Sequence, residues 1–184
     1  MVAFQKKTIL RYELFGMLFI SLLGGLLHFT FEWSGYQPIV SVFSAVNESV
    51  WEHLKLGFWP VLLYTIIEYW RIKKETNNFF LAKTVAPYAI IAIIPVIFYS
   101  YTSITGESIF VIDLLSFFVA VVIAQFLSYK LLTHKQLSNK LEKVAILALL
   151  LLAVAFIVFT FYPPHLPIFQ DPISGEYGII NHLH

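Results

Sequence analysis

The sequence predicts an all-α protein that crosses a lipid bilayer about five times. Hydrophobic residues make up 59% of its 184 residues and charged residues only 12%, compared with about 25% charged residues in a soluble domain. The hydrophobic residues gather in long runs, and the basic residues between these runs are strongly biased to one side. Because we find no internal repeat or linker, we expect residues 1–184 to form a single helical transmembrane domain.

A membrane-spanning helix takes roughly 20 mainly apolar residues, and five segments meet that length. The first follows a basic N-terminus and is longer than the core of a signal peptide, which favours an uncleaved span. The second has a polar start and Pro60 near its middle, and the third contains Pro87 and Pro95, so both are expected to bend. The fourth and fifth are almost continuously apolar. The predicted spans cover approximately residues 13–33, 50–70, 79–101, 109–132 and 141–162.

The basic residues predict how the chain is oriented. With five spans, those on the N-terminal side of the membrane are Lys6, Lys7, Arg11, Arg71, Lys73, Lys74, Lys83, Lys130, Lys135, Lys140 and Lys143. Only Lys55 falls on the other side. The positive-inside rule then places the N-terminus in the cytoplasm and the C-terminus outside a cell membrane, with residues 163–184 as an ordered outer tail. Glu68, three residues before Arg71, is expected to pair with it.

Composition also excludes several functions. The net charge of +1, with no basic patch, gives no basis for binding nucleic acid. The chain has no cysteine, which excludes disulfides, thiolate ligands and a cysteine nucleophile. The bilayer is therefore the one partner that the composition indicates, and no oligomeric state can be inferred from it.

A short polar stretch at the start of the second span stands out from its apolar surroundings. Asn47, Glu48, Glu52, His53 and Lys55 lie within nine residues, and burying such groups is costly unless they are paired, hydrated or bound to an ion. One interpretation is a capped helix entry, in which Asn47 is the N-cap and Lys55 pairs with Glu52. The other is a functional site, because carboxylates at positions 48 and 52 would share a helical face beside an imidazole.

The predicted topology brings further polar residues to the same outer face. His28 and Glu32 share a face near the end of the first span, and Asp113 begins the fourth. Imidazole and carboxylate groups suit Zn²⁺, which would lower the pKa of a bound water. The predicted metal ligands are His28, Glu32, His53, His165 and Asp171. Glu48 or Glu52 would be the catalytic base, and Asn47 and Asp113 would be further polar members of the site.

Three stretches together resemble an uncharacterised family of small multi-pass bacterial membrane proteins. They are residues 28–35 (HFTFEWSG), residues 42–55 (VFSAVNESVWEHLK) and residues 162–178, which begin with Tyr-Pro-Pro-His. The resemblance implies a helical membrane domain and brings no activity with it. In arrangement alone, the chain is similar to intramembrane zinc hydrolases of the ceramidase type, which place His and Asp between helices near one membrane face. The paired His-x-x-x-His of that group is absent here.

Three functions are compatible with these features. The first is a zinc-dependent membrane hydrolase that acts on a lipid or lipid-linked substrate at the outer leaflet. The second is a non-enzymatic binder, transporter or sensor for a cation, a proton or a small solute. The third is a structural partner whose polar cluster locks helices together.

Overall fold

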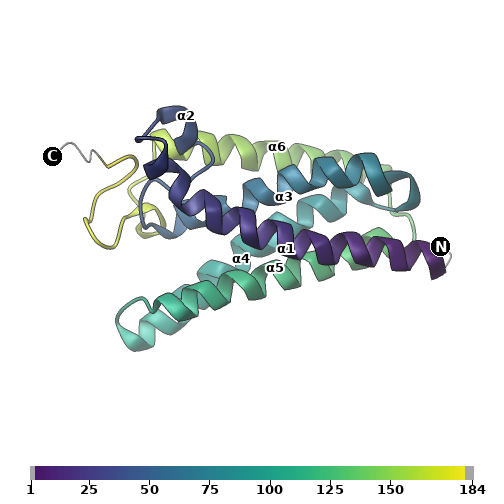
Figure 1. Ribbon diagram of the computed structural model, residues 1–184, viewed down its shortest axis with the longest axis horizontal. Coiled ribbons are helices and arrows are strands. Elements are labelled where there is room, and N and C mark those ends of the chain that lie inside the picture. Colours follow the sequence, from purple (N-terminus) through teal and green to yellow (C-terminus); the bar gives the residue numbers. More distant parts are fainter. Residues whose placement is uncertain (1–2, 181–184) are drawn as a thin grey trace.

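The computed structural model describes residues 3–180, and in this range the chain forms a bundle of five long α-helices (Figure 1). The long helices are α1 (Ala3–Trp33), α3 (Val50–Ile72), α4 (Phe79–Thr105), α5 (Phe110–Thr133) and α6 (Asn139–Phe161). Three short elements complete the fold: α2 (Pro38–Ser41), the 3₁₀ turn η1 (Lys73–Glu75) and the 3₁₀ turn η2 (Pro167–Phe169). No strand occurs within residues 3–180, where pairing is limited to one bridge between Gln170 and Tyr177. The prediction of an all-α protein is confirmed.

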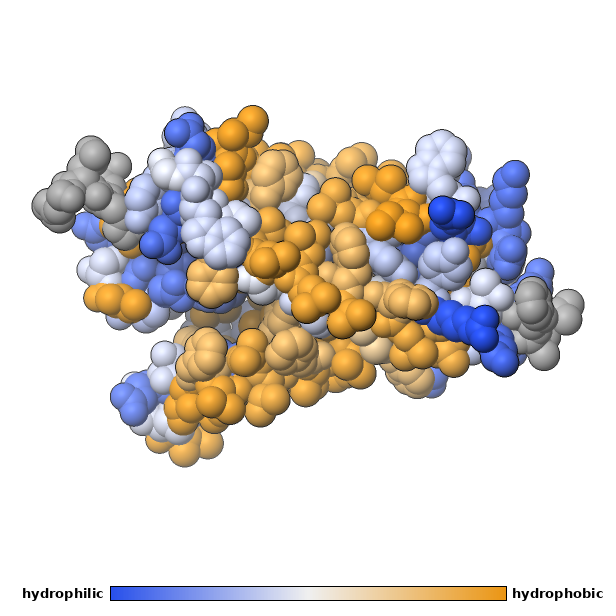
Figure 2. Space-filling view, in the orientation of Figure 1, coloured by the Kyte–Doolittle hydropathy of each residue, from blue (hydrophilic) through white to orange (hydrophobic). Residues whose placement is uncertain are grey.

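Four of the five helices are long and apolar enough to cross a membrane. They are α1 from Gln5 onward, α4, α5 and α6, and Figure 2 shows hydrophobic residues around the middle of the molecule with hydrophilic residues at both ends. The fifth, α3, is long enough but more polar, since it carries Glu52 and Lys55 near its start and Glu68 and Arg71 near its end. The structure thus supports a multi-pass membrane protein.

The predicted spans agree with the observed helices to within four residues, except at the start of α1. That helix begins at Ala3, about ten residues before the predicted span, because its first turns are amphipathic and not apolar. The prolines do not end the helices that contain them: α3 runs through Pro60, and α4 runs through Pro87 and Pro95. Neighbouring helices can compensate the missing backbone hydrogen bond in such a bundle.

Helix α3 lies inside the bundle and packs against α1 and α4. Its Phe58 packs against Phe156 of α6 with the rings tilted and their centroids 4.9 Å apart, and both rings are buried in the main hydrophobic core. At the end of the bundle near the C-terminus, the α4–α5 hairpin diverges from the other helices (Figure 1). A hollow opens there between the hairpin and the remaining helices (Figure 2).

The same end of the bundle is covered by the segment that connects α1 to α3 and by the C-terminal segment after α6 (Figure 1). The two segments are joined by a hydrogen bond of 2.8 Å from Asn47 Nδ2 to the carbonyl of Gly178. Ser44 fixes the first segment to α1, because its Oγ donates to the carbonyl of Leu27 and accepts from the amide of Phe31. The predicted tail is therefore held against the bundle as far as Gly178, and its last four residues lie outside the described range.

Two adjacent glycines of α1 provide a test of this packing. A Cβ on Gly24 would lie 2.6 Å from the backbone oxygen of Leu56 and 2.8 Å from the ring of Phe117, whereas a Cβ on Gly25 would meet nothing within 4 Å. We therefore predict that Gly24→Ala lowers the melting temperature of the detergent-solubilised protein. Gly25→Ala should leave the melting temperature unchanged or stabilise the protein by up to about 1 kcal/mol. Alanine has the higher helix propensity at both positions, so the difference between the two variants reports the clash at Gly24. Equal effects would contradict the close approach of α1 to α3.

Candidate functional site

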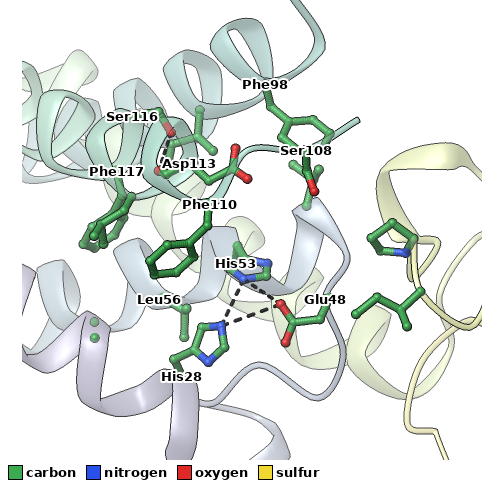
Figure 3. A pocket seen from close by; sticks show the side chains of 17 residues that line it. His28, Glu48, His53, Leu56, Phe98, Ser108, Phe110, Asp113, Ser116 and Phe117 are labelled. Carbon is green, nitrogen blue, oxygen red and sulfur yellow. Dashed lines mark hydrogen bonds and ion pairs between the residues drawn. The ribbon is translucent and has the colours of Figure 1, made fainter. Parts of the chain in front are cut away.

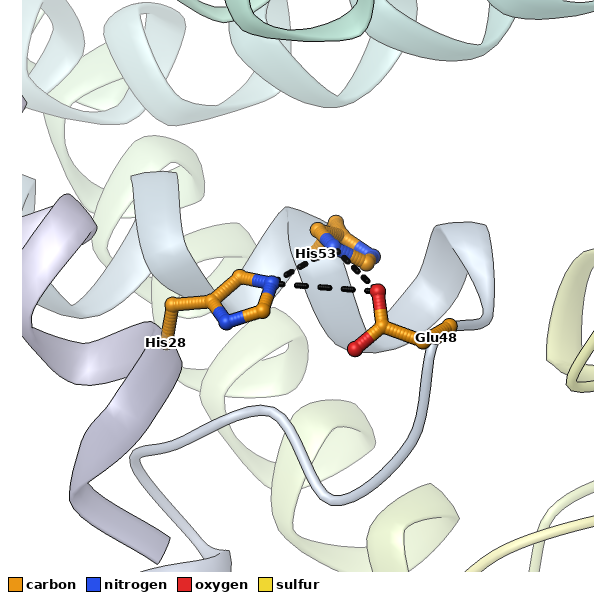
Figure 4. Close-up of side chains that lie close together, drawn as sticks. All are labelled: His28, Glu48 and His53. Atoms are coloured by element: carbon orange, nitrogen blue, oxygen red, sulfur yellow. Dashed lines mark hydrogen bonds and ion pairs between the residues drawn. The ribbon is translucent and has the colours of Figure 1, made fainter. Parts of the chain in front are cut away.

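Three side chains from separate parts of the chain meet beside this hollow. His28 comes from α1, Glu48 from the loop before α3, and His53 from the first turn of α3 (Figure 4). The Nε2 atoms of the two histidines are 3.2 Å apart. Glu48 Oε2 lies 3.4 Å from His53 Nε2 and 3.8 Å from His28 Nε2. All three side chains are partly open to solvent, with between 31% and 45% of their surface exposed.

The start of α3 determines how His53 is presented. Ser49 is the N-cap, with its Oγ accepting the amide of Glu52, and its carbonyl oxygen lies 2.9 Å from His53 Nδ1. Because a carbonyl only accepts, Nδ1 carries the hydrogen, and Nε2 is the ring atom that faces His28 and Glu48. The predicted Asn47 cap is thus replaced by Ser49. The pattern Ser49-x-x-Glu52 is a capping-box signature that could have identified it from the sequence.

The three atoms have the spacing of ligands around one small metal ion. A circle through points 3.2, 3.4 and 3.8 Å apart has a radius of about 2.0 Å, which is close to the Zn–N and Zn–O bond lengths in proteins. Two imidazoles and one carboxylate are also the protein ligands of several catalytic zinc sites, which keep a further position open. Without a metal ion, the same spacing would require a hydrogen bond between the two imidazoles and an ion pair between Glu48 and a protonated ring.

Asp171 of the C-terminal segment holds Glu48 in place. Its Oδ2 accepts the backbone amide of Glu48 at 3.1 Å, while its Oδ1 accepts the amides of Ile173 and Ser174 at 2.7 and 2.9 Å. Burial by itself would raise the pKa of Asp171, but the amide donors of Ser174, Glu48 and Ile173 hold that pKa below its ordinary value. Asp171 is therefore an ionised anchor for the loop, and the structure does not place it among the three convergent side chains.

The structure separates Glu52 from this group. Its carboxylate forms a buried ion pair with Lys55 and accepts the amide of Val46 at 3.1 Å. Lys55 also donates to the carbonyl of Ser41 and to Thr160 Oγ1, at 2.7 and 2.9 Å. The sequence predicted that Glu48 and Glu52 share a helical face. This prediction is wrong, because α3 begins only at residue 50 and Glu48 lies in the loop before it. Glu52 is thereby committed to fixing the loop that carries Glu48.

The remaining predicted site residues lie around the group without joining it. Glu32 is exposed at the end of α1. Asn47 is buried where the loop before α3 contacts the C-terminal segment, and its Oδ1 accepts the amide of Ser49. Asp113 accepts a hydrogen bond of 2.5 Å from the hydroxyl of Tyr101, a partner that no sequence pattern indicated. His165 is exposed, and its ring packs on that of Tyr177 with centroids 4.6 Å apart.

Two hollows adjoin the convergent group. The first, here called the apolar cavity, has a volume of about 430 Å³ and lies between α1, α3, α4 and α5. His28, Glu48 and His53 lie along one side of it, while Phe98, Phe110, Phe117, Asp113 and Ser116 line the facing wall (Figure 3). The second, here called the polar pocket, has a volume of about 740 Å³ and is shared by His28, Glu32, Glu48, Asp171 and Glu176, among others. No Lys or Arg of the described chain lines either hollow.

Nearly the whole chain matches one protein family. Residues 1–179 match DUF6512, which is described as a family of unknown function. The chain belongs to this family, and the resemblance to an uncharacterised family is confirmed. No curated protein and no solved structure matches the chain.

The role of Asp171 can be tested through its ionisation. In Asp171→Asn an amide NH₂ group replaces one acceptor oxygen, so we predict a loss of about 1–3 kcal/mol in the free energy of unfolding of the tail. Because the pKa of Asp171 is lowered in the folded protein, its contribution is complete above the ordinary range of a carboxyl group and disappears as the pH falls through the lowered value.

Hydrogen exchange of residues 171–178, measured across this acidic range, checks the prediction. The difference between wild type and Asp171→Asn should narrow at low pH, while the matched variant Glu176→Gln, exposed in the same loop, should follow wild type throughout. A difference that is constant with pH would show that the Asp171 carboxylate does not anchor the loop.

Proposed function

We propose that this member of DUF6512 is a membrane-embedded, metal-dependent hydrolase with its site at His28, Glu48 and His53. The observation that carries the proposal is the spacing of their three ligand atoms, which fits one ion at bonding distance. The apolar cavity adjoins the same atoms and leaves room for a substrate. Zn²⁺ is the ion that best matches two imidazoles and a carboxylate, and it would supply an activated water at neutral pH.

The two hollows suit the two reactants of a hydrolysis. The apolar cavity is bounded by four helices and walled mainly by aliphatic and aromatic side chains, as the acyl chain of a lipid requires. The polar pocket reaches His28 and Glu48 from the other side, where water is available. Since neither hollow carries a Lys or Arg within the described chain, a neutral or cationic lipid headgroup fits better than a phosphate.

The division of roles among the carboxylates follows from their contacts. Glu48 would be a metal ligand, and Glu52 is held by Lys55, so neither is free to accept a proton from water. Asp113 lines the apolar cavity opposite the histidines and is the carboxylate that we assign to proton transfer (Figure 3). Its hydrogen bond from Tyr101 would fix the orientation of the carboxylate.

A sensor for a divalent cation is the second candidate. The hydrogen bond from the amide of Glu48 to Asp171 favours it, because this contact links a candidate ligand to the C-terminal segment. Binding at the three side chains would then be transmitted to the outer surface without any reaction. Metal content does not distinguish the two functions, whereas turnover does.

The proposed hydrolase can be tested by its zinc content and by its activity on lipids. We expect about one zinc ion per purified chain, falling to near zero in His28→Ala and His53→Ala because each change removes one of three ligands. His165→Ala is the matched control, since His165 is exposed and packs on Tyr177, and it should retain the metal. Elemental analysis measures the metal, and release of fatty acid from a neutral fluorescent acyl lipid measures activity with and without a chelator.

Two outcomes would be decisive. Zinc content that is unchanged in His53→Ala would overturn the metal site and with it the hydrolase. Stoichiometric zinc without turnover of neutral, cationic or anionic lipids would favour the sensor.

We further propose that α3 is a fifth span, with the N-terminus in the cytoplasm and the metal site on the outer side of the cell membrane. The bias of basic residues supports this orientation, as does the length of α3, which covers 23 residues.

The absence of cysteine permits a direct test of this topology. Single cysteines placed at the exposed positions Glu107 and Ser174 should react with a membrane-impermeant maleimide in intact cells. Cysteines at the exposed positions Glu75 and Gln136 should react only after permeabilisation. If α3 does not cross the membrane and the N-terminus stays in the cytoplasm, labelling at all four positions will be reversed.

A further inference from the structure

A second cluster of charged side chains is buried far from the candidate metal site. Glu13 of α1, Glu68 of α3 and Lys83 of α4 are each only 1% exposed. Lys83 Nζ lies 2.7 Å from Glu13 Oε1 and 2.6 Å from Glu68 Oε2. Fifteen residues of helix separate Glu13 from His28, which places the two sites about 22 Å apart along α1.

The helix α5 completes the cluster. Ser128 accepts a hydrogen bond of 2.9 Å from Lys83 and donates one of 2.9 Å to Glu13 Oε1. The structure corrects one prediction here. Glu68 pairs with Lys83 and not with Arg71, which is exposed. Lys83, counted among the basic residues on the N-terminal side, is buried within α4.

The charges of the cluster do not balance. Two carboxylates face one ammonium group, so full ionisation would leave one negative charge buried among apolar helices, which is strongly unfavourable. Two oxygen atoms also lack a hydrogen-bond partner, namely Glu13 Oε2 and Glu68 Oε1, although both are buried. The two carboxyl groups are close enough to interact directly with each other.

We infer that the cluster is a proton-binding site, in which Glu13 and Glu68 share one proton. The bound proton makes the cluster electrically neutral, with one carboxylate paired to the Lys83 ammonium and the other carboxyl group uncharged. It also converts one carboxyl oxygen into a donor, which can satisfy an oxygen of the other group. Carboxylates that share a site commonly hold a single proton in this way.

Within residues 3–180, no neighbouring group donates a hydrogen bond to either of these oxygens. The hydroxyl of Tyr64 donates to the backbone oxygen of Tyr12 at 2.6 Å, and Gln125 Nε2 lies 3.4 Å from the backbone oxygen of Glu13. The helices are also in very close contact here, since a Cβ on Gly16 would lie 2.2 Å from Gln125 Nε2 and 2.7 Å from the Tyr64 ring. Such packing favours a proton over a hydrated metal cation.

Infrared spectroscopy of the full-length protein tests the inference directly. At neutral pH we expect a C=O stretching band of one protonated carboxyl group per chain, which shifts when glutamate is labelled with ¹³C. The band should disappear in both Glu68→Gln and Glu13→Gln, because an amide replaces the neutral acid in each case. Glu75→Gln, at an exposed position of η1, is the matched control and should keep the band.

Thermal unfolding gives a second and independent readout. Each single glutamine variant should melt close to wild type, since it mimics the protonated carboxyl group. The double variant should be much less stable, because it leaves the Lys83 ammonium without a carboxylate.

The absence of a labelled band in wild type at neutral pH would overturn the inference, as would a band that survives in both single variants. If the protein lacks the band and its melting temperature rises with Na⁺ but not with choline, the cluster binds a metal cation and not a proton.

Discussion

The ion pair between Lys55 and Glu52 is the constraint on which the end of the bundle near the C-terminus depends. Lys55 is fully buried, so its charge must be matched by nearby acceptors. It finds them in Glu52, in the carbonyl of Ser41 and in Thr160 of α6, and it thereby connects three parts of the fold. Glu52 in turn binds the amide of Val46. The loop that leads to Glu48 is thus fixed by the Lys55–Glu52 ion pair, because separating these two charges in an apolar environment would be very unfavourable.

This arrangement explains how a site can form from side chains on different elements. His28 is carried by a long helix, and His53 is oriented by the N-cap of α3, whereas Glu48 lies on a loop. The loop would be mobile without the buried ion pair on one side and the Asp171 carboxylate on the other. Rigid supports of this kind are needed wherever ligands must hold a bonding distance. The proposed hydrolase therefore depends on groups that never contact its metal.

Hydropathy predicts the helices well, because in a membrane each span must satisfy its own backbone and present an apolar surface. The sequence also predicts the depth of His28, Glu48 and His53, since each lies near the same end of a span. It does not predict which polar residues meet. Glu48 and Glu52 look equivalent at a spacing of four, and only the helix start at residue 50 separates the loop carboxylate from the buried one. Nor does hydropathy predict that Lys83, near the start of α4, is buried against Glu13 and Glu68.

The X-ray absorption spectrum of the purified protein at the zinc edge, after addition of one equivalent of zinc, would show directly which atoms bind the ion. We expect two imidazole nitrogens and one carboxylate oxygen at about 2.0–2.2 Å, with one imidazole missing in His53→Ala. A zinc environment that is the same in wild type and in His53→Ala would contradict this expectation, because the ion would then lie somewhere other than between His28, Glu48 and His53.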